Sequence, residues 1–506
     1  MTGTRGARRG AILAALMMTM ALAAMDTTIV STAIPQIVAD LGGYTQFSWV
    51  FSGYLLTQTV TIPIYGKLAD LYGRKPVLIV GAAVFLAGSA LCAAAWNMPT
   101  LIVFRAVQGL GAGAVQAIVS TLAGDLYDLT ERGRVQGWLS SVWGVSAIVG
   151  PTLGGAFAEY STWRWIFLIN LPIGAIALTL IGRFLHEDVE PTPHRIDYPG
   201  ALLVLGAAVA VIFGLLQGGT AWPWLSPASI GVFAAAAACT AGAVIVERRA
   251  AEPVMPPWVW GKRLLASVNL ATIGFGILVI GPNTFLPTYA QGVLGLGPIA
   301  AGLVLAAMSL GWPLASGQSA RLYLRIGFRD TALAGATLAI IACAWLVLMP
   351  RVPAVWQIVV AIFILGAGFG WLSTGAIVGV QSTVDWNRRG TVTSANMFSR
   401  FLGQSLGAAV FGAVANAALH DRLAAAPAHL RGLPSSADGI TRALEHDPAS
   451  PAAAYLRAAL ATATHHVYLG LAATAVVVAL ILALATPRRF PVISRAADSA
   501  SDPAER

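Results

Sequence analysis

The sequence predicts an all-α polytopic membrane protein, because of its composition, its long apolar runs and the placement of its basic residues. Of the 506 residues, 57% are hydrophobic and only 10% carry a charge, and the mean hydropathy is +0.73. A soluble domain carries about 25% charged residues. The composition therefore excludes a soluble domain held by one membrane anchor.

Apolar runs long enough to cross a bilayer recur along the whole chain, and a span takes roughly 20 residues. We expect fourteen transmembrane helices, at 11–34, 48–66, 77–96, 99–124, 136–158, 164–185, 199–217, 227–247, 266–290, 298–317, 331–349, 354–380, 392–418 and 465–486.

The basic residues orient these spans, because loops on the cytoplasmic side are enriched in Lys and Arg. With the N-terminus inside, the inner segments hold 23 of the 31 Lys and Arg residues and the outer segments hold 6. The remaining two, Arg105 and Arg400, lie deep within helices. We expect a multi-pass protein of the inner (cytoplasmic) membrane with both termini cytoplasmic. The net charge of +9 then belongs to inner loops and indicates no nucleic-acid partner.

A weak internal repeat divides the chain into two halves. Residues 66–72 follow the second span and residues 317–323 follow the tenth, and Gly, Ala, Leu and Tyr match in place. Repeated halves are common in transporters with alternating access. The expected parts are a cytoplasmic N-terminus (1–10), a six-helix bundle (11–185), two inserted helices with flanking loops (186–265), a second six-helix bundle (266–486) with a long outer loop (418–464), and a cytoplasmic tail (487–506).

Other local features carry less weight. Arg5, Arg8 and Arg9 precede the first apolar run as in a signal peptide, but many spans follow, which favours an uncleaved first helix. The three cysteines lie in apolar runs, so no disulfide is expected. The histidines of the outer loop match no zinc-binding spacing. No metal or cofactor is expected. The sequence has no phosphate-binding P-loop, so direct ATP coupling is not expected either.

Asp26 is a carboxylate inside the first span. Burying such a charge in hydrocarbon costs about 2.5 kcal/mol or more, and residues that bear this cost usually have a function. The other acids fall in loops or at helix ends. We therefore expect Asp26 to bind protons. The alternative is an Asp at a helix end that bonds to Thr27 or Thr28.

Arg105 in the fourth span needs a partner, because its guanidinium stays charged. Asp26 lies eight residues from the outer end of its span and Arg105 lies six. At a rise of about 1.5 Å per residue, both side chains are about 9–12 Å deep and can meet. The alternative is that Arg105 reaches outward to the membrane surface.

The loop after the second span contains Gly66, Asp70, Gly73 and Arg74. Asp70 can cap a helix N-terminus or pair with Arg74. We expect a cytoplasmic latch that holds one conformation, and the alternative is an ordinary basic loop.

The fifth span is rich in small residues around a proline. Pro151 removes a backbone donor and bends the helix, and glycines allow close helix contact. We expect a bent helix that seals the two halves against each other, with simple helix packing as the alternative. The residues concerned are Gly144, Gly150, Pro151, Gly154 and Gly155.

These stretches resemble motifs of the major facilitator superfamily. The loop from Gly66 to Pro76 is similar to its signature loop, although Leu71 stands where the family usually has a basic residue. The stretch around Arg105 resembles the fourth-helix motif, whose arginine is implicated in proton transfer. The stretch from Gly144 to Gly155 resembles the antiporter motif, which is found in exporters and largely lacking in symporters.

Two further stretches resemble the fourteen-helix drug:proton antiporter branch, the EmrB/QacA type of multidrug efflux transporter. They are the Asp26 stretch, with Ser31 in place of the usual Asn, and the run from Trp163 to Pro172. The resemblance implies a major facilitator fold of two six-helix bundles plus two extra helices. It also implies that Asp26 and Arg105 couple transport to protons.

Polar and aromatic residues of several spans can line a substrate cavity, or they can simply join helices. Some members of the resembled branch that handle dicationic drugs have a second intramembrane acid. Spans nine to thirteen contain none, so the resemblance implies singly charged, neutral or zwitterionic cargo. The candidates are Gln58, Gln108, Asn283, Tyr289, Asn396, Phe398 and Gln404.

The function implied is proton-driven export of hydrophobic drugs or antibiotics across the cytoplasmic membrane by alternating access. The expected partners are protons, a small hydrophobic drug-like substrate and the lipid bilayer, and the chain is expected to act as a monomer. The alternatives are a dedicated proton-linked exporter of one endogenous metabolite, lipid or siderophore, and a receptor or scaffold that has lost transport. An enzyme is not expected, because no catalytic constellation is evident.

Overall fold

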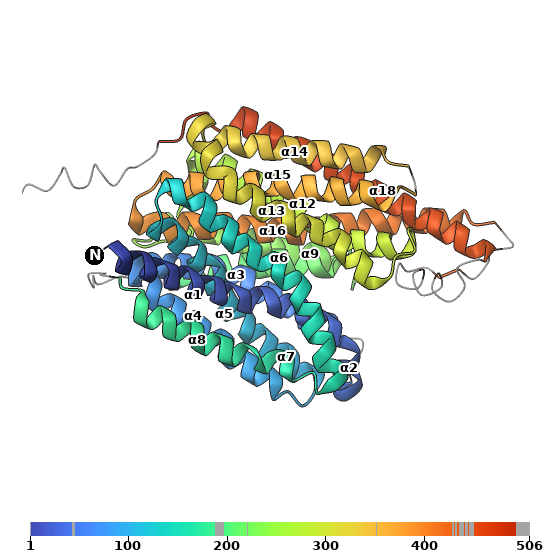
Figure 1. The fold of residues 1–506 in the computed structure, drawn as a ribbon, viewed down its shortest axis with the longest axis horizontal. Coiled ribbons are helices and arrows are strands. Elements are labelled where there is room, and N and C mark those ends of the chain that lie inside the picture. The colour runs from blue at the N-terminus through green and yellow to red at the C-terminus, as the bar shows by residue number, and fades with distance from the viewer. Residues whose placement is uncertain are drawn as a thin grey trace, which may run out of the picture.

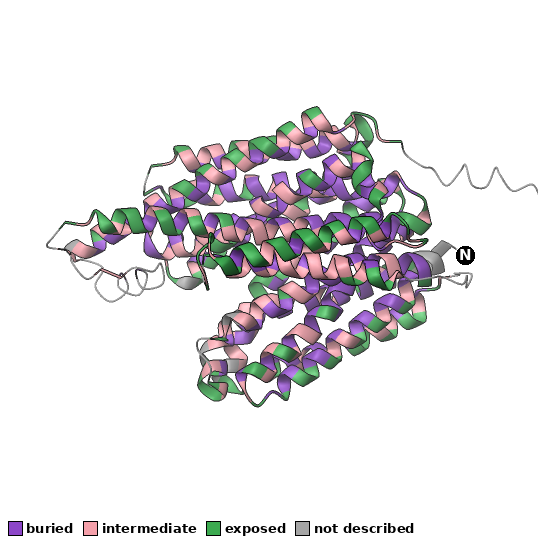
Figure 2. Cartoon of the chain, turned by 180° about the vertical axis from the view of Figure 1, so that it is seen from behind, coloured by how far each residue is buried: buried purple, intermediate pink, exposed green. Residues whose placement is uncertain are grey.

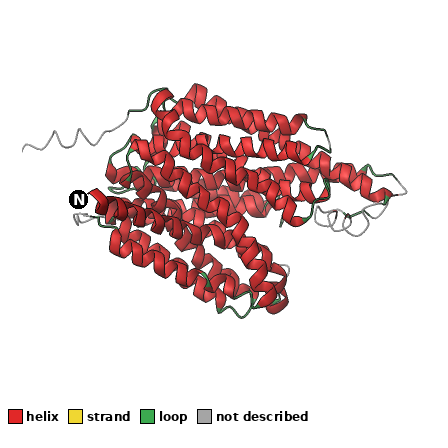
Figure 3. Cartoon of the chain, viewed as in Figure 1, coloured by secondary structure: helices red, strands yellow, loops and turns green. Residues whose placement is uncertain are grey.

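The computed structural model describes residues 2–42, 46–187, 197–219, 221–350, 352–427 and 450–491, together with residues 430, 433–434, 440 and 444. The regular elements in these ranges are helices (Figure 3). The main helices are α1 (Thr2–Ile29), α2 (Ile34–Leu41), α3 (Ser48–Tyr72), α4 (Arg74–Ala93), α5 (Met98–Leu126), α6 (Leu129–Tyr160), α7 (Trp165–Leu168), α8 (Asn170–Phe184), α9 (Tyr198–Gln217), α10 (Pro227–Glu247), α11 (Pro257–Gly261), α12 (Arg263–Gly292), α13 (Pro298–Ile326), α14 (Phe328–Leu348), α15 (Val355–Ser382), α16 (Arg389–Ala424) and α18 (Pro451–Leu480).

The helices form two bundles that lie side by side (Figure 1). The first bundle contains α1 to α8, and the second contains α12 to α18. Each bundle has an apolar core, centred on side chains such as Phe85 in the first and Phe369 in the second. The buried faces point inward and most of the exposed residues lie on the periphery (Figure 2). Burial of these faces holds each bundle together.

Twelve helices of the described chain are long and apolar enough to cross a membrane. This is two fewer than the fourteen spans that the sequence predicts. The two missing from this set are α3 and α6, which have 25 and 32 residues and so are of spanning length, but whose composition is less apolar. Both pack against the opposite bundle, where polar side chains need not face lipid.

The helices α9 and α10 lie between the two bundles in sequence. α9 packs against both α3 and α16, whereas α10 packs mainly on α9. Ile212 of α9 shares an apolar cluster with Val60 of α3 and Phe398 of α16. The inserted pair therefore covers one side of the junction between the bundles.

The bundles meet at the end of the molecule that carries the N-terminus and diverge toward the opposite end (Figure 1). We call the first the latch end and the second the splayed end. At the latch end, Gly73 connects α3 to α4 and Gly327 connects α13 to α14, and both have a φ of 91°. Such a φ is free of strain only for glycine. The two halves thus share one turn geometry, although Gly327 lies three residues beyond the position that the predicted repeat pairs with Gly73.

Parts of the expected outer loop at 418–464 are helical. α16 continues to Ala424 and α18 begins at Pro451, so both helices project beyond their expected spans at the splayed end. Leu419, Ile440 and Leu456 pack together there. Most of the expected tail, from residue 492 onward, lies outside the described residues.

Candidate functional site

Asp26 and Arg105 form an ion pair inside the first bundle. Asp26 lies one turn before the end of α1, and Arg105 lies two turns into α5. The Arg105 Nη1 atom donates to the Asp26 Oδ2 atom at 2.5 Å, and neither residue is exposed. The structure therefore brings together the two residues that the sequence places at one depth.

Three further polar side chains close a hydrogen-bond network around the acid. Gln108 Nε2 donates to Asp26 Oδ1 at 2.8 Å and to Ser89 Oγ at 3.0 Å. Asn170 Nδ2 also donates to Ser89 Oγ, at 2.9 Å, and the Ser89 hydroxyl donates to the carbonyl of Phe167 at 3.1 Å. Four helices, α1, α4, α5 and α8, thus contribute to one buried polar site.

Arg105 is also held on its other sides. Its Nη1 atom donates to Gln108 Oε1 at 2.7 Å, and its Nε atom donates to the Val50 carbonyl at 3.2 Å. The guanidinium lies 4.2 Å from the centre of the Tyr54 ring. Within the described residues, Arg105 Nη2 and the Tyr54 hydroxyl have no hydrogen-bond partner. The cation is therefore fixed in place but retains a free donor.

In this arrangement, Asp26 can bind a proton only by giving up its ion pair with Arg105. Removing one partner of a buried pair typically costs about 3–5 kcal/mol, because the other charge is left uncompensated. Protonation of Asp26 would leave Arg105 in that position, with Gln108, Tyr54 and the Val50 carbonyl as its remaining neighbours. Proton binding at this site must therefore favour a conformation in which Arg105 finds other contacts.

Sequence reasoning did not find Tyr54, Ser89 or Asn170. Ser89 and Asn170 were detectable as isolated polar residues within apolar spans, and they fall on helices adjacent to the pair. Their rotation toward Asp26 depends on how the helices pack, which depth along a span does not give.

The glycines of α6 contact two different neighbours. A Cβ atom on Gly144 would lie 2.9 Å from the Ser309 carbonyl of α13, in the opposite bundle. A Cβ atom on Gly150 or on Gly154 would instead lie 2.1 or 2.2 Å from the hydroxyls of Thr28 or Thr32, in its own bundle. Gly155 has nothing within 4 Å of such an atom.

Gly144 therefore faces the opposite bundle, whereas Gly150 and Gly154 face their own bundle, and the expected seal between the halves stays a prediction. Pro151 lies within α6 beside Gly150, where the helix packs on α1 rather than on the second bundle. The Thr28 hydroxyl donates to the Ser146 carbonyl at 2.9 Å. Because Thr28 lies two residues from Asp26, this part of α6 braces the ion-pair site instead of closing the interface.

Asp70 joins the two bundles at the latch end. Its Oδ1 atom accepts from the backbone N–H of Gly390 at 2.8 Å, and its Oδ2 atom accepts from the N–H of Thr391 at 2.7 Å. These are orphan donors of the first turn of α16, so Asp70 caps a helix of the opposite bundle. Arg74 donates to Asp70 Oδ1 at 3.1 Å. A Cβ atom on Gly66 would overlap Ser394 of α16, which explains the glycine at this close approach.

Arg74 extends this contact into a buried charge network. It donates to Asp125 Oδ2 at 3.0 Å, and Arg389 of the second bundle donates to Asp125 Oδ1 at 3.0 Å. The Arg74 guanidinium also lies 3.5 Å from the centre of the Trp386 ring and donates to the Trp386 carbonyl. Burial raises the pKa of Asp70 to about 6, although Arg74 and the α16 donors lower it. Asp70, Arg74, Asp125 and Arg389 thus link the two bundles at the latch end in this conformation.

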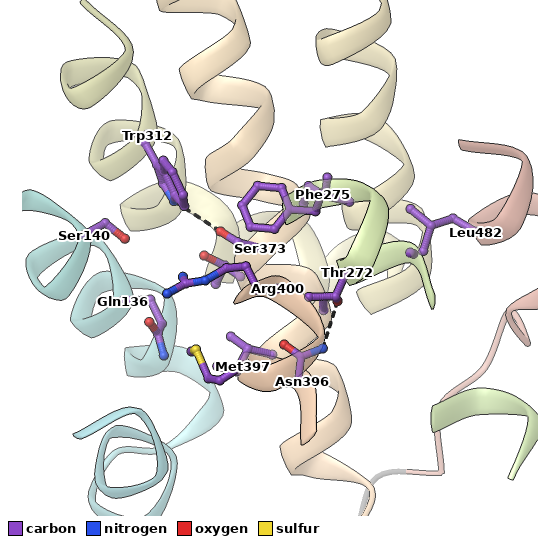
Figure 4. Close-up of a pocket in the computed structure, with 15 residues that line it drawn as sticks. Gln136, Ser140, Thr272, Phe275, Trp312, Ser373, Asn396, Met397, Arg400 and Leu482 are labelled. Carbon is purple, nitrogen blue, oxygen red and sulfur yellow. Dashed lines mark hydrogen bonds between the residues drawn. The ribbon is translucent and has the colours of Figure 1, made fainter. Parts of the chain in front are cut away.

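A pocket opens between α6 and the second bundle (Figure 4). It encloses about 560 Å³ of space between atoms, part of which is open to solvent. The lining residues are Gln136, Ser140, Ala271, Thr272, Phe275, Trp312, Leu372, Ser373, Thr374, Ala376, Ile377, Asn396, Met397, Arg400 and Leu482.

Of the predicted cavity residues, Asn396 lines this pocket, where its side chain donates to the Thr272 hydroxyl at 2.8 Å. Tyr289 lines a second pocket with His465, within the second bundle. Gln108 belongs to the ion-pair network. The remaining four do not line either pocket: Gln58 is buried, Asn283 is exposed, Phe398 packs near α9, and Gln404 is half-buried on α16.

Comparison with known proteins agrees with this architecture. Residues 16–408 match the family model "Major Facilitator Superfamily". The chain is 35% identical over 407 residues to "Multidrug resistance protein 3" of Bacillus subtilis (strain 168), covering 80% of this chain and 79% of that protein. It is 33% identical over 444 residues to "Multidrug transporter protein MdtP" of the same organism, covering 87% and 81%.

The fold is also similar to a solved structure. The crystal structure of the human organic anion transporter MFSD10 superposes with a TM-score of 0.62 at 14% identity, covering 94% of this chain and 99% of that one. At this identity the likeness concerns the fold alone. The family model and the two bacterial relatives each span most of the chain, and the chain therefore belongs to the major facilitator superfamily.

Proposed function

We propose that this protein is a proton-driven antiporter that exports hydrophobic drug-like molecules across the cytoplasmic membrane. The relatives named for multidrug resistance and transport support drug efflux. The observation that carries proton coupling is the fully buried ion pair between Asp26 and Arg105. Such a pair is costly to bury, and a protonatable acid within a membrane domain is by default a functional candidate.

In this proposal the fourteen-helix topology holds, with α3 and α6 as the two additional spans. Both termini are cytoplasmic, so the latch end faces the cytoplasm and the splayed end faces outward. The arrangement described here is then open to the outside. Asp26 takes up an external proton, Arg105 loses its partner, and the bundles rearrange to release the latch and open inward.

Asp26→Asn tests the proposal, because it keeps size and hydrogen bonding but removes the titrating charge. The purified protein is placed in proteoliposomes with an imposed pH gradient, and accumulation of a panel of dyes and antibiotics is measured. We expect the variant to lose uphill transport while downhill exchange of cargo remains. Accumulation at the wild-type rate would show that coupling does not depend on Asp26.

A further inference from the structure

Arg400 is a second arginine deep in the helical region. It belongs to α16, which runs from Arg389 to Ala424. With about 3.6 residues and 5.4 Å per turn, Arg400 lies roughly 16 Å from the start of this helix and roughly 36 Å from its end. The side chain is thus far from both ends, and it faces the pocket between α6 and the second bundle.

Unlike Arg105, Arg400 has no acidic partner. Across the described ranges it makes no hydrogen bond and no ion pair, and its Nε atom is buried without an acceptor. The acids nearest to it along the chain are Asp385 and Asp421, one beyond each end of the buried part of α16. A charge in this position is expensive unless something compensates it.

The guanidinium faces the pocket and lies 4.9 Å from the centre of the Phe401 ring. Figure 4 shows it between Gln136 and Ser140 of α6 on one side and Trp312 and Ser373 on the other. Ser140 and Arg400 lie equally far from the latch-end starts of their helices, so they share a level. A ligand at Arg400 would therefore touch both bundles.

Aromatic rings form the other wall of the same pocket. Phe275 and Trp312 meet edge to face with ring centres 5.5 Å apart, and both line the pocket. Phe369 supports them from behind, at 5.3 Å from Phe275 and 5.6 Å from Trp312. This rigid cluster presents an apolar surface for a flat ring next to a fixed positive charge.

We propose that the pocket selects aromatic organic anions and zwitterions. The carboxylate of the cargo binds Arg400, which offers a planar set of donors suited to two carboxylate oxygens. The ring of the cargo lies against Phe275 and Trp312. This inference rests on the proposed transport function and adds a cargo class to it. The carboxylate that Arg400 lacks within the protein comes from the cargo.

The test uses three probes of nearly equal size: 1-naphthaleneacetate, the neutral 1-naphthaleneacetamide and the cationic 2-(1-naphthyl)ethylammonium. Binding to the full-length protein in nanodiscs is measured by titration calorimetry. We expect the wild type to bind the anion about tenfold or more tighter than the amide, as for hydrogen bonds to a charged group. The cation should bind most weakly. Equal affinity for anion and amide in the wild type would overturn the inference without any variant.

Arg400→Gln should remove the preference for the anion while amide affinity stays within about twofold, and Arg400→Lys should keep part of the preference. Retained amide binding shows that the variants are folded. Arg422→Gln, at the exposed end of the same helix, is the matched control and should bind all three probes as the wild type does. Wild-type anion preference in Arg400→Gln would contradict the proposal.

Asp26→Asn separates this inference from proton coupling. The variant should retain anion preference in binding and lose only uphill transport. A wild type that prefers the anion but never accumulates it under a pH gradient would refute the antiport proposal and leave the cargo assignment standing. If the amide and the cation accumulate as readily as the anion, the cargo assignment is refuted and the antiport proposal stands.

Discussion

Arg105 and Arg400, the two arginines farthest from the helix ends in α5 and α16, have opposite surroundings. Arg105 is matched by a carboxylate, an amide and a backbone carbonyl, whereas Arg400 faces a pocket with an aromatic wall. This difference is the basis for proposing different roles, since Arg105 already has an anionic partner and Arg400 can attract an anion from outside the protein. In our proposals, the proton site lies within the first bundle and the cargo site lies between α6 and the second bundle.

The first prediction is that Arg105→Lys fails to replace arginine. The guanidinium bonds to Asp26, Gln108 and the Val50 carbonyl at once and lies over Tyr54. A lysine ammonium is a compact point charge and cannot span these acceptors in one plane. We expect uphill export to fall about tenfold or more, a loss on the scale of one hydrogen bond to a charged group.

Proteoliposome accumulation measures this loss, and thermal unfolding of the purified variant checks that the bundle is intact. Arg164→Lys is the control, because that arginine pairs with Asp40 on a partly exposed surface of the same bundle. If Arg105→Lys transports at the wild-type rate, the several hydrogen bonds of the guanidinium are unnecessary and its positive charge alone suffices.

At the residue scale, sequence reasoning succeeded where regular geometry decides the outcome. Asp26 and Arg105 meet because helical rise is constant, so counting residues from the span ends gives their depth. Ser89, Asn170 and Tyr54 were missed because depth does not give rotation about the helix axis. The pocket at Arg400 exists because α6 packs against the second bundle. A local sequence pattern does not predict that contact.

At the element scale, α6 changes partner along its length. Its first half packs on α13, where Gly133 and Gly137 come close to Ala320 and Gly317. Its second half packs on α1 near Thr28. One helix therefore contacts both the bundle interface and the helix that carries Asp26. Movement at either place must affect the other, because close-packed surfaces do not deform continuously.

The second prediction is that Gly150→Leu abolishes proton-driven export. Even a Cβ atom at this position would lie 2.1 Å from the Thr28 hydroxyl and 3.3 Å from the backbone nitrogen of Ile29. α1 must therefore shift just beyond Asp26, and the ion pair loses its geometry. Accumulation in inside-out vesicles measures the loss, with cargo binding as the check on folding.

Gly155→Leu provides the matched control, since nothing lies within 4 Å of a Cβ atom there. It makes the same change on the same helix and should leave export near the wild-type level. Equal damage from both substitutions would indicate that α6 cannot accept a larger residue anywhere in this stretch, and the link to Asp26 would fail.

Hydropathy predicted most elements of the fold correctly, and its failures are informative. Apolar runs located helices such as α9 and α10 because lipid-facing helices must be apolar. α3 and α6 fall short of that signal because they pack against the opposite bundle. The helical extensions around Ala424 and Pro451 were read as loop, since helices that leave the membrane lose the constraint that makes hydropathy useful.

At the scale of the whole molecule, the two bundles are held together at the latch end. Asp70 caps α16, Asp125 bridges Arg74 to Arg389, and the Tyr323 hydroxyl donates to the Leu129 carbonyl. The sequence indicated the pair of Asp70 and Arg74 but not the partners of Asp70 on α16, because those lie in the other half of the chain. Which conformation the latch holds is a property of the assembled bundles alone.

The last prediction is that acid strengthens the latch. The pKa of Asp70 in the latched state is raised by burial to about 6, against 3.8 for an exposed aspartate. Asp70 lies beyond the span expected at 48–66, so it titrates with the solution at that end. The latched state therefore binds more protons than the unlatched state as the pH falls through 6. By linkage, the ratio of latched to unlatched molecules should rise about tenfold between pH 7 and pH 5.

Spin labels on cysteines at Arg134 and Leu324, exposed positions at the latch end of α6 and α13, report the distance between the bundles. The experiment is done in an Asp26→Asn background, so that the proton-coupling acid cannot contribute. The short-distance population should grow from pH 7 to pH 5, and Asp70→Asn should make it independent of pH because the neutral amide cannot titrate. A population that shrinks in acid would mean that ionised Asp70 is the form that holds α16, with its bonds to Gly390 and Thr391 outweighing the cost of burial.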